Sequence, residues 1–111
     1  MAHVDSDMLM GLKDLLGGKF SQLVESYITD CSARFERMKV AASGNDLAEV
    51  RQEAHGIKGS SRNVGANGLG DLCGVIEDQS HKNDDTDLDQ KIAAAEQLFA
   101  AIRDELNLLL N

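Results

Sequence analysis

The hydrophobic positions of this chain recur with the spacing of an amphipathic α-helix along five segments. These segments cover about residues 5–16, 19–42, 46–63, 67–80 and 87–110. The last is the most regular, and its apolar residues alternate steps of four and three: Leu88, Ile92, Ala95, Phe99, Ile102, Leu106 and Leu109. No segment alternates apolar and polar residues for long enough to predict a strand. The pattern therefore predicts an all-α protein.

Glycines and short polar stretches separate the predicted helices. Gly17 and Gly18 are a C-cap signal after the first helix, and Gly65 predicts the end of the third. Asn45 or Asp46 can cap the start of the third helix, and the polar stretch 80–87 forms a loop before the fifth. Four long amphipathic helices with short connections predict an antiparallel four-helix bundle. The short extra N-terminal helix is expected to cover one end or side of it.

Length and composition favour a single domain spanning residues 1–111. The chain has 111 residues, no proline and no tryptophan, which suits one small helical domain. Its net charge is −8, so we expect no nucleic acid and no anionic membrane surface as partner. No run approaches the 18 apolar residues of a membrane span, and the N-terminus shows no export signal. Cys31 and Cys73 match no zinc or redox spacing, which favours buried thiols in a reducing cytoplasm.

The third helix carries an unusual polar face. Four residues predict its buried face: Val50, Ala54, Ile57 and Ser61. At about 100° per residue, His55 points about 130° away from that face. Arg51, Lys58 and Arg62 lie within about 60° of His55, and with it they form what we call the basic stripe. Because the rest of the chain is strongly acidic, this stripe is suited to a localised anion or an acidic partner surface.

Two glycines lie beside the histidine. Gly59 falls about 40° from His55 on the same exposed face, and Gly56 falls about 100° away. Each glycine weakens a helix by roughly 1 kcal/mol relative to alanine. The missing side chain at Gly59 leaves the imidazole open to approach. The sequence offers no comparable reason for Gly56.

Several other chemistries fit these residues poorly. The positions four residues before and after His55 are Arg51 and Gly59, so a helical metal site is disfavoured. Ser60 and Ser61 do not share the direction of His55, which argues against a hydrolytic nucleophile. The stretch 65–70, GANGLG, follows a helix and lacks the GK[ST] of a P-loop, so no ATP site is expected.

A plain surface reading also fits single features of this face, because an exposed histidine or a basic stripe is most often only solvated. We give His3 and His81 that reading, since His3 lies in a terminus expected to be mobile and His81 in a loop. His55 differs in having a lysine one turn on and an open approach. A free imidazole is largely neutral at pH 7, with a pKa of about 6.5, and its nitrogen can accept a phosphoryl group. Lys58 and the arginines can offset the phosphoryl charge, while a partner would supply metal and carboxylates.

The segment AHGIKGSSRNVGANGL resembles the signature of histidine-containing phosphotransfer (HPt) domains, which reads roughly AHxLKGxxxxxGxxxL. Seven residues fill it in register: Ala54, His55, Ile57 in place of leucine, Lys58, Gly59, Gly65 and Leu69. The following helix is also similar, through Leu72, Cys73 and Glu77. The family fold is a four-helix bundle with the histidine in mid-helix. The resemblance implies that His55 is phosphorylated on Nε2, that Lys58 meets the phosphoryl oxygens and that Gly59 gives access. Arg51 and Arg62 are added from their place on the helix.

The resemblance implies a stand-alone phosphotransfer protein of a multistep two-component phosphorelay. It would carry a phosphoryl group between aspartates of receiver domains in hybrid sensor kinases and response regulators. The chain would need no cofactor of its own, because the divalent cation belongs to the receiver, and it could not phosphorylate itself. We expect a cytoplasmic monomer. Two alternatives are a non-catalytic helical adaptor using the same face and an excised segment of a larger sensor kinase. The start at Met1 and the polar end at Asn111 favour a separate protein over the latter.

Overall fold

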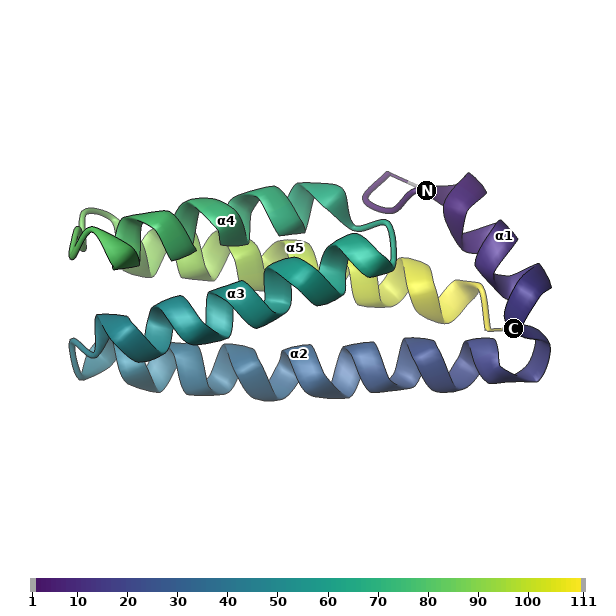
Figure 1. The fold of residues 1–111 in the computed structure, drawn as a ribbon, viewed down its shortest axis with the longest axis horizontal. Helices are drawn as coiled ribbons and strands as arrows, with labels where there is room; N and C mark the ends of the chain where they lie inside the picture. The colour runs from purple at the N-terminus through teal and green to yellow at the C-terminus, as the bar shows by residue number, and fades with distance from the viewer. Residues whose placement is uncertain (1, 111) are drawn as a thin grey trace.

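The computed structural model describes residues 2–110, and they form helices joined by short turns (Figure 1). The elements in chain order are α1 (Ser6–Leu16), a 3₁₀ turn η1 (Gly17–Lys19), α2 (Phe20–Ser43), α3 (Leu47–Asn63), α4 (Asn67–His81) and α5 (Leu88–Leu108). Helices α2 to α5 run along the long axis of a body measuring 42 × 20 × 18 Å (Figure 1). The expected all-α fold, a four-helix bundle with an extra N-terminal helix, is therefore confirmed.

Helix α1 crosses one end of the bundle, beside the start of α2 and the end of α5 (Figure 1). Gly17 ends α1 with a positive φ of 56°, which a residue without a Cβ adopts freely. Gly65, with φ of 75°, makes the sharp turn from α3 into α4. The predicted boundaries hold to within one or two residues. His81 is the last residue of α4 rather than part of the loop, and α5 ends at Leu108 rather than near 110.

The start of α3 is fixed by a side chain. Asp46 accepts a hydrogen bond from the backbone N–H of Glu49 at 3.2 Å, which satisfies one of the free amides of the first turn. The preceding Asn45 has φ of 60° and makes the tight turn out of α2. Of the two caps that the sequence allowed, the structure uses Asp46.

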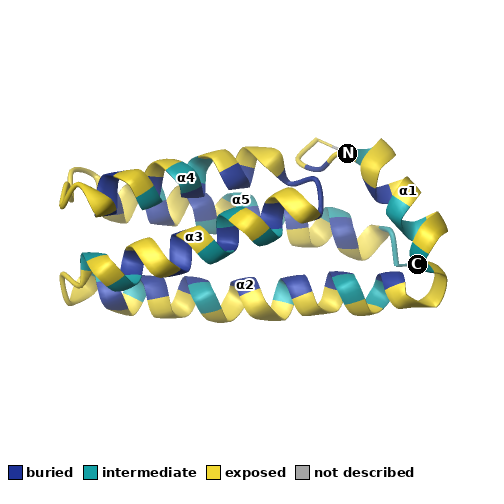
Figure 2. Ribbon diagram, viewed as in Figure 1, coloured by how far each residue is buried: buried dark blue, intermediate teal, exposed yellow. Residues whose placement is uncertain are grey.

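The core lies along the axis of the bundle, where each helix turns its buried stripe inward (Figure 2). The predicted apolar faces of α3 and α5 are buried, including Val50, Ile57 and Ile102, each with no exposed surface. The exception is Leu109, which follows α5 and is only partly buried. Ser61 lies in the same core, and its hydroxyl shares a 2.8 Å hydrogen bond with the Tyr27 hydroxyl. This bond satisfies both buried oxygens, so the polar residue at position 61 on the inner face of α3 is not left unpaired.

Cys31 and Cys73 are free and fully buried, as the sequence suggested. Burial raises the pKa of both thiols to about 12, so both are neutral near pH 7. They pack as small apolar side chains in the core.

The N-terminal segment is tied to the bundle, in contrast to the mobile end that we expected. The backbone N–H of His3 donates to Glu105 Oε1 at 2.9 Å, and His3 Nδ1 also contacts Glu105 Oε2. Val4 is buried, and the N–H of Asp5 donates to the carbonyl of Gly65 at 3.0 Å. The segment therefore joins the α3–α4 turn to α5 at the end of the bundle remote from the α2–α3 turn. Within residues 2–110, no helix is apolar and long enough to cross a membrane.

Candidate functional site

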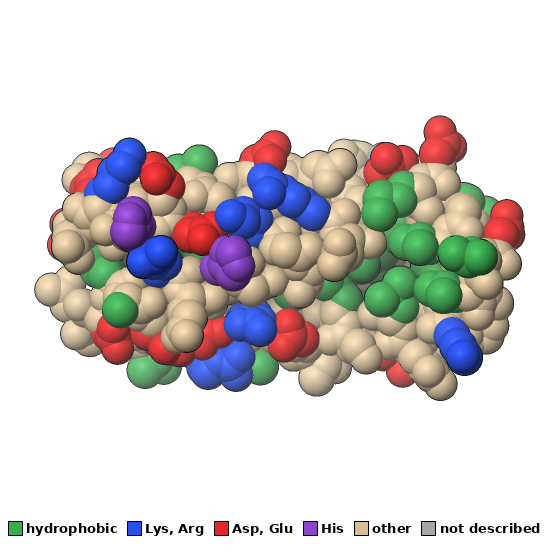
Figure 3. Space-filling view, viewed as in Figure 1, with side chains coloured by type: hydrophobic (Ala, Val, Ile, Leu, Met, Phe, Trp, Pro, Cys, Tyr) green, Lys and Arg blue, Asp and Glu red, His purple; other side chains and the backbone are tan. Residues whose placement is uncertain are grey.

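His55 lies near the middle of α3, on the side turned away from the core. Its side chain is 68% exposed, whereas the adjacent Ala54 is fully buried. Histidine side chains stand among basic and acidic side chains on the face that α3 and α4 share (Figure 3). The outward direction deduced from the helical spacing is confirmed, because residues 54 and 55 lie about 100° apart on one helix.

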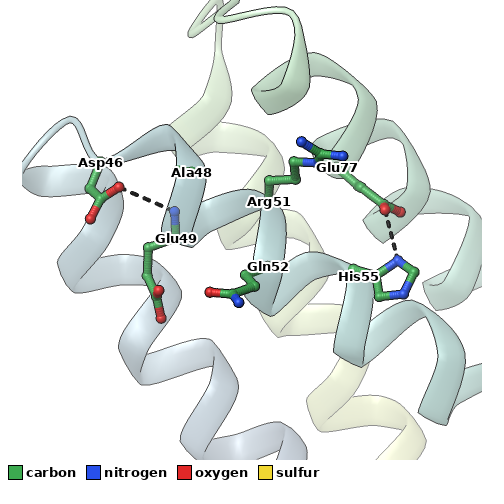
Figure 4. A pocket seen from close by; sticks show the side chains of 7 residues that line it. All are labelled: Asp46, Ala48, Glu49, Arg51, Gln52, His55 and Glu77. Carbon is green, nitrogen blue, oxygen red and sulfur yellow. Dashed lines mark hydrogen bonds and ion pairs between the residues drawn. The ribbon is translucent and has the colours of Figure 1, made fainter.

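Glu77 of α4 holds the imidazole. His55 Nδ1 lies 2.8 Å from Glu77 Oε2, and the two side chains meet at the edge of a hollow (Figure 4). An ionised carboxylate only accepts hydrogen bonds, so Nδ1 must carry the proton. The lone pair of the neutral ring is then on Nε2, which is the nitrogen free to act as a nucleophile.

Lys58 shares this carboxylate. Its Nζ lies 2.5 Å from Glu77 Oε1, so one carboxylate bridges an imidazole and an ammonium. Burial alone would raise the pKa of Glu77, but hydrogen bonds from Lys58 and His55 outweigh it and hold that pKa below its usual value. Glu77 is therefore ionised at neutral pH, as its role as acceptor requires.

The remaining cations of the basic stripe also face α4. Arg62 Nη2 lies 3.4 Å from Asp71 Oδ1. A Cβ at Gly70 would lie 2.9 Å from Arg62 Cγ, so the arginine side chain packs on α4 where residue 70 has no side chain. Arg51 lines a hollow of about 610 Å³ together with Gln52, His55 and Glu77 (Figure 4). The stripe is thus partly neutralised by acidic residues of α4.

The two glycines of α3 have different surroundings. A Cβ built on Gly59 meets nothing within 4 Å, so the space above it is open, as the proposed approach path needs. A Cβ on Gly56 would lie 2.4 Å from Cζ of Arg34, a residue of α2. Gly56 therefore lies under a side chain from a neighbouring helix, which no feature of α3 alone could reveal.

Sequence reasoning named His55, Lys58, Gly59, Arg51 and Arg62 but gave no role to Glu77. A signal was present, because Gly70, Gly74 and Glu77 are spaced by four and three and so share one face of α4. Lys58 Cδ would lie 3.5 Å from a Cβ at Gly74, so that face receives the side chains of α3. Two successive turns with glycine on one face, followed by a carboxylate on the same face, indicate where long basic side chains of a neighbouring helix can lie across α4.

The comparisons with known proteins agree with this arrangement. The family model described as Hpt domain matches residues 22–111. Among solved structures, the chain is similar to the crystal structure of histidine-containing phosphotransfer protein B (HptB) from Pseudomonas aeruginosa PAO1. The TM-score is 0.92 at 24% sequence identity, covering 96% of this chain and 93% of that chain. At that identity the likeness shows the shared fold. No curated protein sequence matches this chain.

The family match covers most of the chain, so the chain belongs to the Hpt domain family. It is a histidine phosphotransfer protein of a phosphorelay, a class whose members interact with receiver domains.

Proposed function

We propose that His55 is the phosphorylated residue and that its Nε2 exchanges the phosphoryl group with aspartates of receiver domains. The observation that carries this is the contact between Nδ1 and Glu77, which places the lone pair of the neutral ring on Nε2, on a side chain that is 68% exposed. A protonated Nε2 would have no lone pair to offer. The same position fills the histidine of the family signature.

In the forward step, the Nε2 lone pair attacks the phosphorus of an aspartyl phosphate. The Nε2–P bond forms, the bond from phosphorus to the aspartate oxygen breaks, and the aspartate leaves as a carboxylate. The ring keeps its Nδ1 proton and gains a positive charge, which the ionised Glu77 beside it stabilises. The reverse step returns the phosphoryl group to the aspartate of another receiver.

In this proposal, Lys58 and the arginines offset the negative charge of the phosphoryl group and of the receiver surface. Lys58 Nζ is held close to the ring by Glu77, from where it can turn to phosphoryl oxygens. Arg51 and Arg62 border the site and meet the acidic surface around the receiver's aspartate. In this proposal the divalent cation belongs to the receiver, and the transfer needs no ATP site on this chain.

We further propose that one copy of the chain suffices, in the cytoplasm. All the residues of the site come from α3 and its neighbours within a single chain. The two free cysteines support a reducing compartment. Partners would be receiver domains of hybrid sensor kinases and response regulators, with neither nucleic acid nor membrane required.

The test uses a receiver domain charged with radiolabelled acetyl phosphate and then mixed with the protein. We expect label on the wild type that is acid-labile and alkali-stable, and none on His55→Gln. His81→Gln is the matched control, since His81 is also an exposed histidine, at the end of α4. Equal labelling of His55→Gln and wild type would contradict the assignment. Binding of a receiver without transfer of label would indicate the adaptor instead.

A further inference from the structure

The hydrogen bond to Glu77 fixes the side on which a phosphoryl group emerges. The two nitrogens of an imidazole point in roughly opposite directions across the ring. His55 Nδ1 faces Glu77 of α4, so Nε2 faces away from α4. Lys58 and Arg62 both pair with carboxylates of α4 and therefore lie on the α4 side of the ring. The phosphoryl group emerges toward the opposite side of α3, which carries Gly59 and Gly56.

A guanidinium from α2 lies on that side. A Cβ at Gly56 would lie 2.4 Å from Cζ and from Nη1 of Arg34, and 2.7 Å from its Nε. The head of Arg34 thus rests against the backbone of the residue next to His55. This cation comes from a different helix than the basic stripe and lies on the other flank of the histidine.

Two carboxylates hold Arg34 in this position. Its Nε donates to Asp30 Oδ2 at 3.0 Å, and its Nη1 donates to Glu53 Oε1 at 3.1 Å. Glu53 is buried, with only 6% of its side chain exposed, and it is also bound by Arg37 at 2.8 Å. A buried carboxylate with two partners is a firm anchor, so the guanidinium is oriented before any partner docks.

Arg34 still has donors to offer. A guanidinium carries five N–H groups, and the two bonds above use two of them. Within residues 2–110, Nη2 of Arg34 makes no hydrogen bond. The side chain is 30% exposed, so these remaining N–H groups can reach a ligand from solvent.

Gly56 is what lets Arg34 lie there. Alanine would strengthen the helix by roughly 1 kcal/mol, yet its Cβ would occupy the place of the guanidinium. If Arg34 served only to neutralise Glu53, Arg37 could do so alone, because its two contacts with Glu53 do not involve Gly56. The glycine is therefore explained by the position of the cation and not by the ion pair.

We propose that Arg34, laid across Gly56, is the cation that donates hydrogen bonds to the phosphoryl group on the α2 side of His55. Lys58 then donates to the phosphoryl oxygens from the α4 side, so the phosphoryl group lies between cations from two helices. Arg34 makes and breaks no covalent bond, and it stabilises the non-bridging oxygens as charge gathers on them. This inference rests on the proposed phosphorylation of His55.

The experiment compares Arg34→Ala, Gly56→Ala and the double variant with Arg37→Ala as the matched control. Arg37 binds the same Glu53 but is not against Gly56. Transfer from a charged receiver should slow on the order of tenfold in Arg34→Ala and in Gly56→Ala, but little in Arg37→Ala. Since Gly56→Ala acts by displacing Arg34, adding it to Arg34→Ala should slow transfer no further.

A second measurement is made on the phosphorylated protein alone, without a receiver domain present. A nearby cation lowers the pKa of a phosphoryl group, so a ³¹P titration of the phosphorylated protein should show that pKa rising in Arg34→Ala and Gly56→Ala and unchanged in Arg37→Ala. Thermal melts should find Gly56→Ala folded. Equal transfer and equal ³¹P titrations in the Arg34 and Arg37 variants would overturn the inference. Labelling of His55→Gln would instead overturn the proposed function itself.

Discussion

Glu77 binds Nδ1 of His55 and leaves Nε2 as the nitrogen that the proposed reaction uses, and the same carboxylate also pairs with Lys58. The replacement Glu77→Gln keeps the size of the side chain but removes its charge. The imidazolium formed on phosphorylation then loses its counter-charge, and Lys58 loses its ion pair. We expect phosphoryl transfer to slow on the order of tenfold, measured with a charged receiver.

The matched control for Glu77 is Asp71→Asn, which removes a carboxylate from the same helix. Asp71 meets Arg62 at 3.4 Å, whereas the carboxylate that His55 binds is Glu77. Its transfer rate should stay near that of the wild type. Equal rates in Glu77→Gln and Asp71→Asn would show that the carboxylate beside His55 does not support the reaction.

Gly59 is expected to matter for access and not for stability. A Cβ at this position meets nothing within 4 Å, so Gly59→Gln should fit the helix and stabilise it by roughly 1 kcal/mol. The long side chain would stand in the path to His55, so transfer should fall by about tenfold or more by a steric argument. Stopped-flow transfer and a thermal melt measure the two effects separately.

Gly11→Gln is the control for this glycine, because Gly11 is a helical glycine of α1 that also has nothing within 4 Å. It should gain similar stability and keep its transfer rate. Unchanged transfer in Gly59→Gln would remove the access role given to that residue.

Helix α3 carries His55, and the cap at its N-terminus lies about two turns before that residue. The cap therefore fixes where the helix that carries the site begins. Asp46→Ala removes the side chain that accepts from the N–H of Glu49. The unfolding free energy should fall by about 1 kcal/mol, measured by urea denaturation. Asp46→Asn, which retains a capping oxygen, should lose much less. Equal losses in the two variants would mean that the charge, and not the cap, stabilises this turn.

Helix α4 makes room for the basic side chains of α3 because it has glycines at two positions of the shared face. Gly70 and Gly74 leave its surface bare where Arg62 and Lys58 cross from α3. Glu77, on the same face, receives the ends of His55 and Lys58. The side chains of the α3 signature therefore depend on the glycines at positions 70 and 74 of α4 for the space that they occupy.

For the molecule as a whole, three carboxylates titrate in acid, of which Glu53 and Glu77 connect neighbouring helices and Glu105 connects α5 to the segment before α1. Burial works to raise the pKa of Glu53, Glu77 and Glu105, but hydrogen bonds from basic or backbone partners outweigh it, and each pKa lies below its usual value. A carboxyl with a lowered pKa in the folded state adds stability at pH above its unfolded value, and that stability is lost as the pH falls through the folded value.

We therefore expect the unfolding free energy to be steady near neutral pH and to fall as the pH drops below about 4.5. Urea denaturation between about pH 7 and about pH 3 measures this. Glu53→Gln removes one of the titrating groups, so its stability should depend less on pH over the same range. An equally steep decline in Glu53→Gln would show that Glu53 does not contribute to the acid response.

The helices and the outward face of α3 could be read from the chain alone. Helical spacing is a local property, so the distances along the sequence from His55 to Ala54 and Ile57 are enough to place His55 away from the buried side. Helix ends were predictable for the same reason, since Asp46, Gly17 and Gly65 act on their nearest neighbours. The antiparallel bundle followed from the short connections.

The partners of His55 could not be read in this way, because they belong to other helices. Glu77 lies 22 residues further along the chain, and Arg34 reaches Gly56 from α2. Which side chains meet between helices depends on which helices are neighbours and how each is rotated, and helical spacing within one segment carries neither. The sequence thus defined an exposed histidine on an open face of α3. The packing of α2 and α4 against α3 decided which ring nitrogen meets a carboxylate, how the ring is oriented and which side chain lies over Gly56.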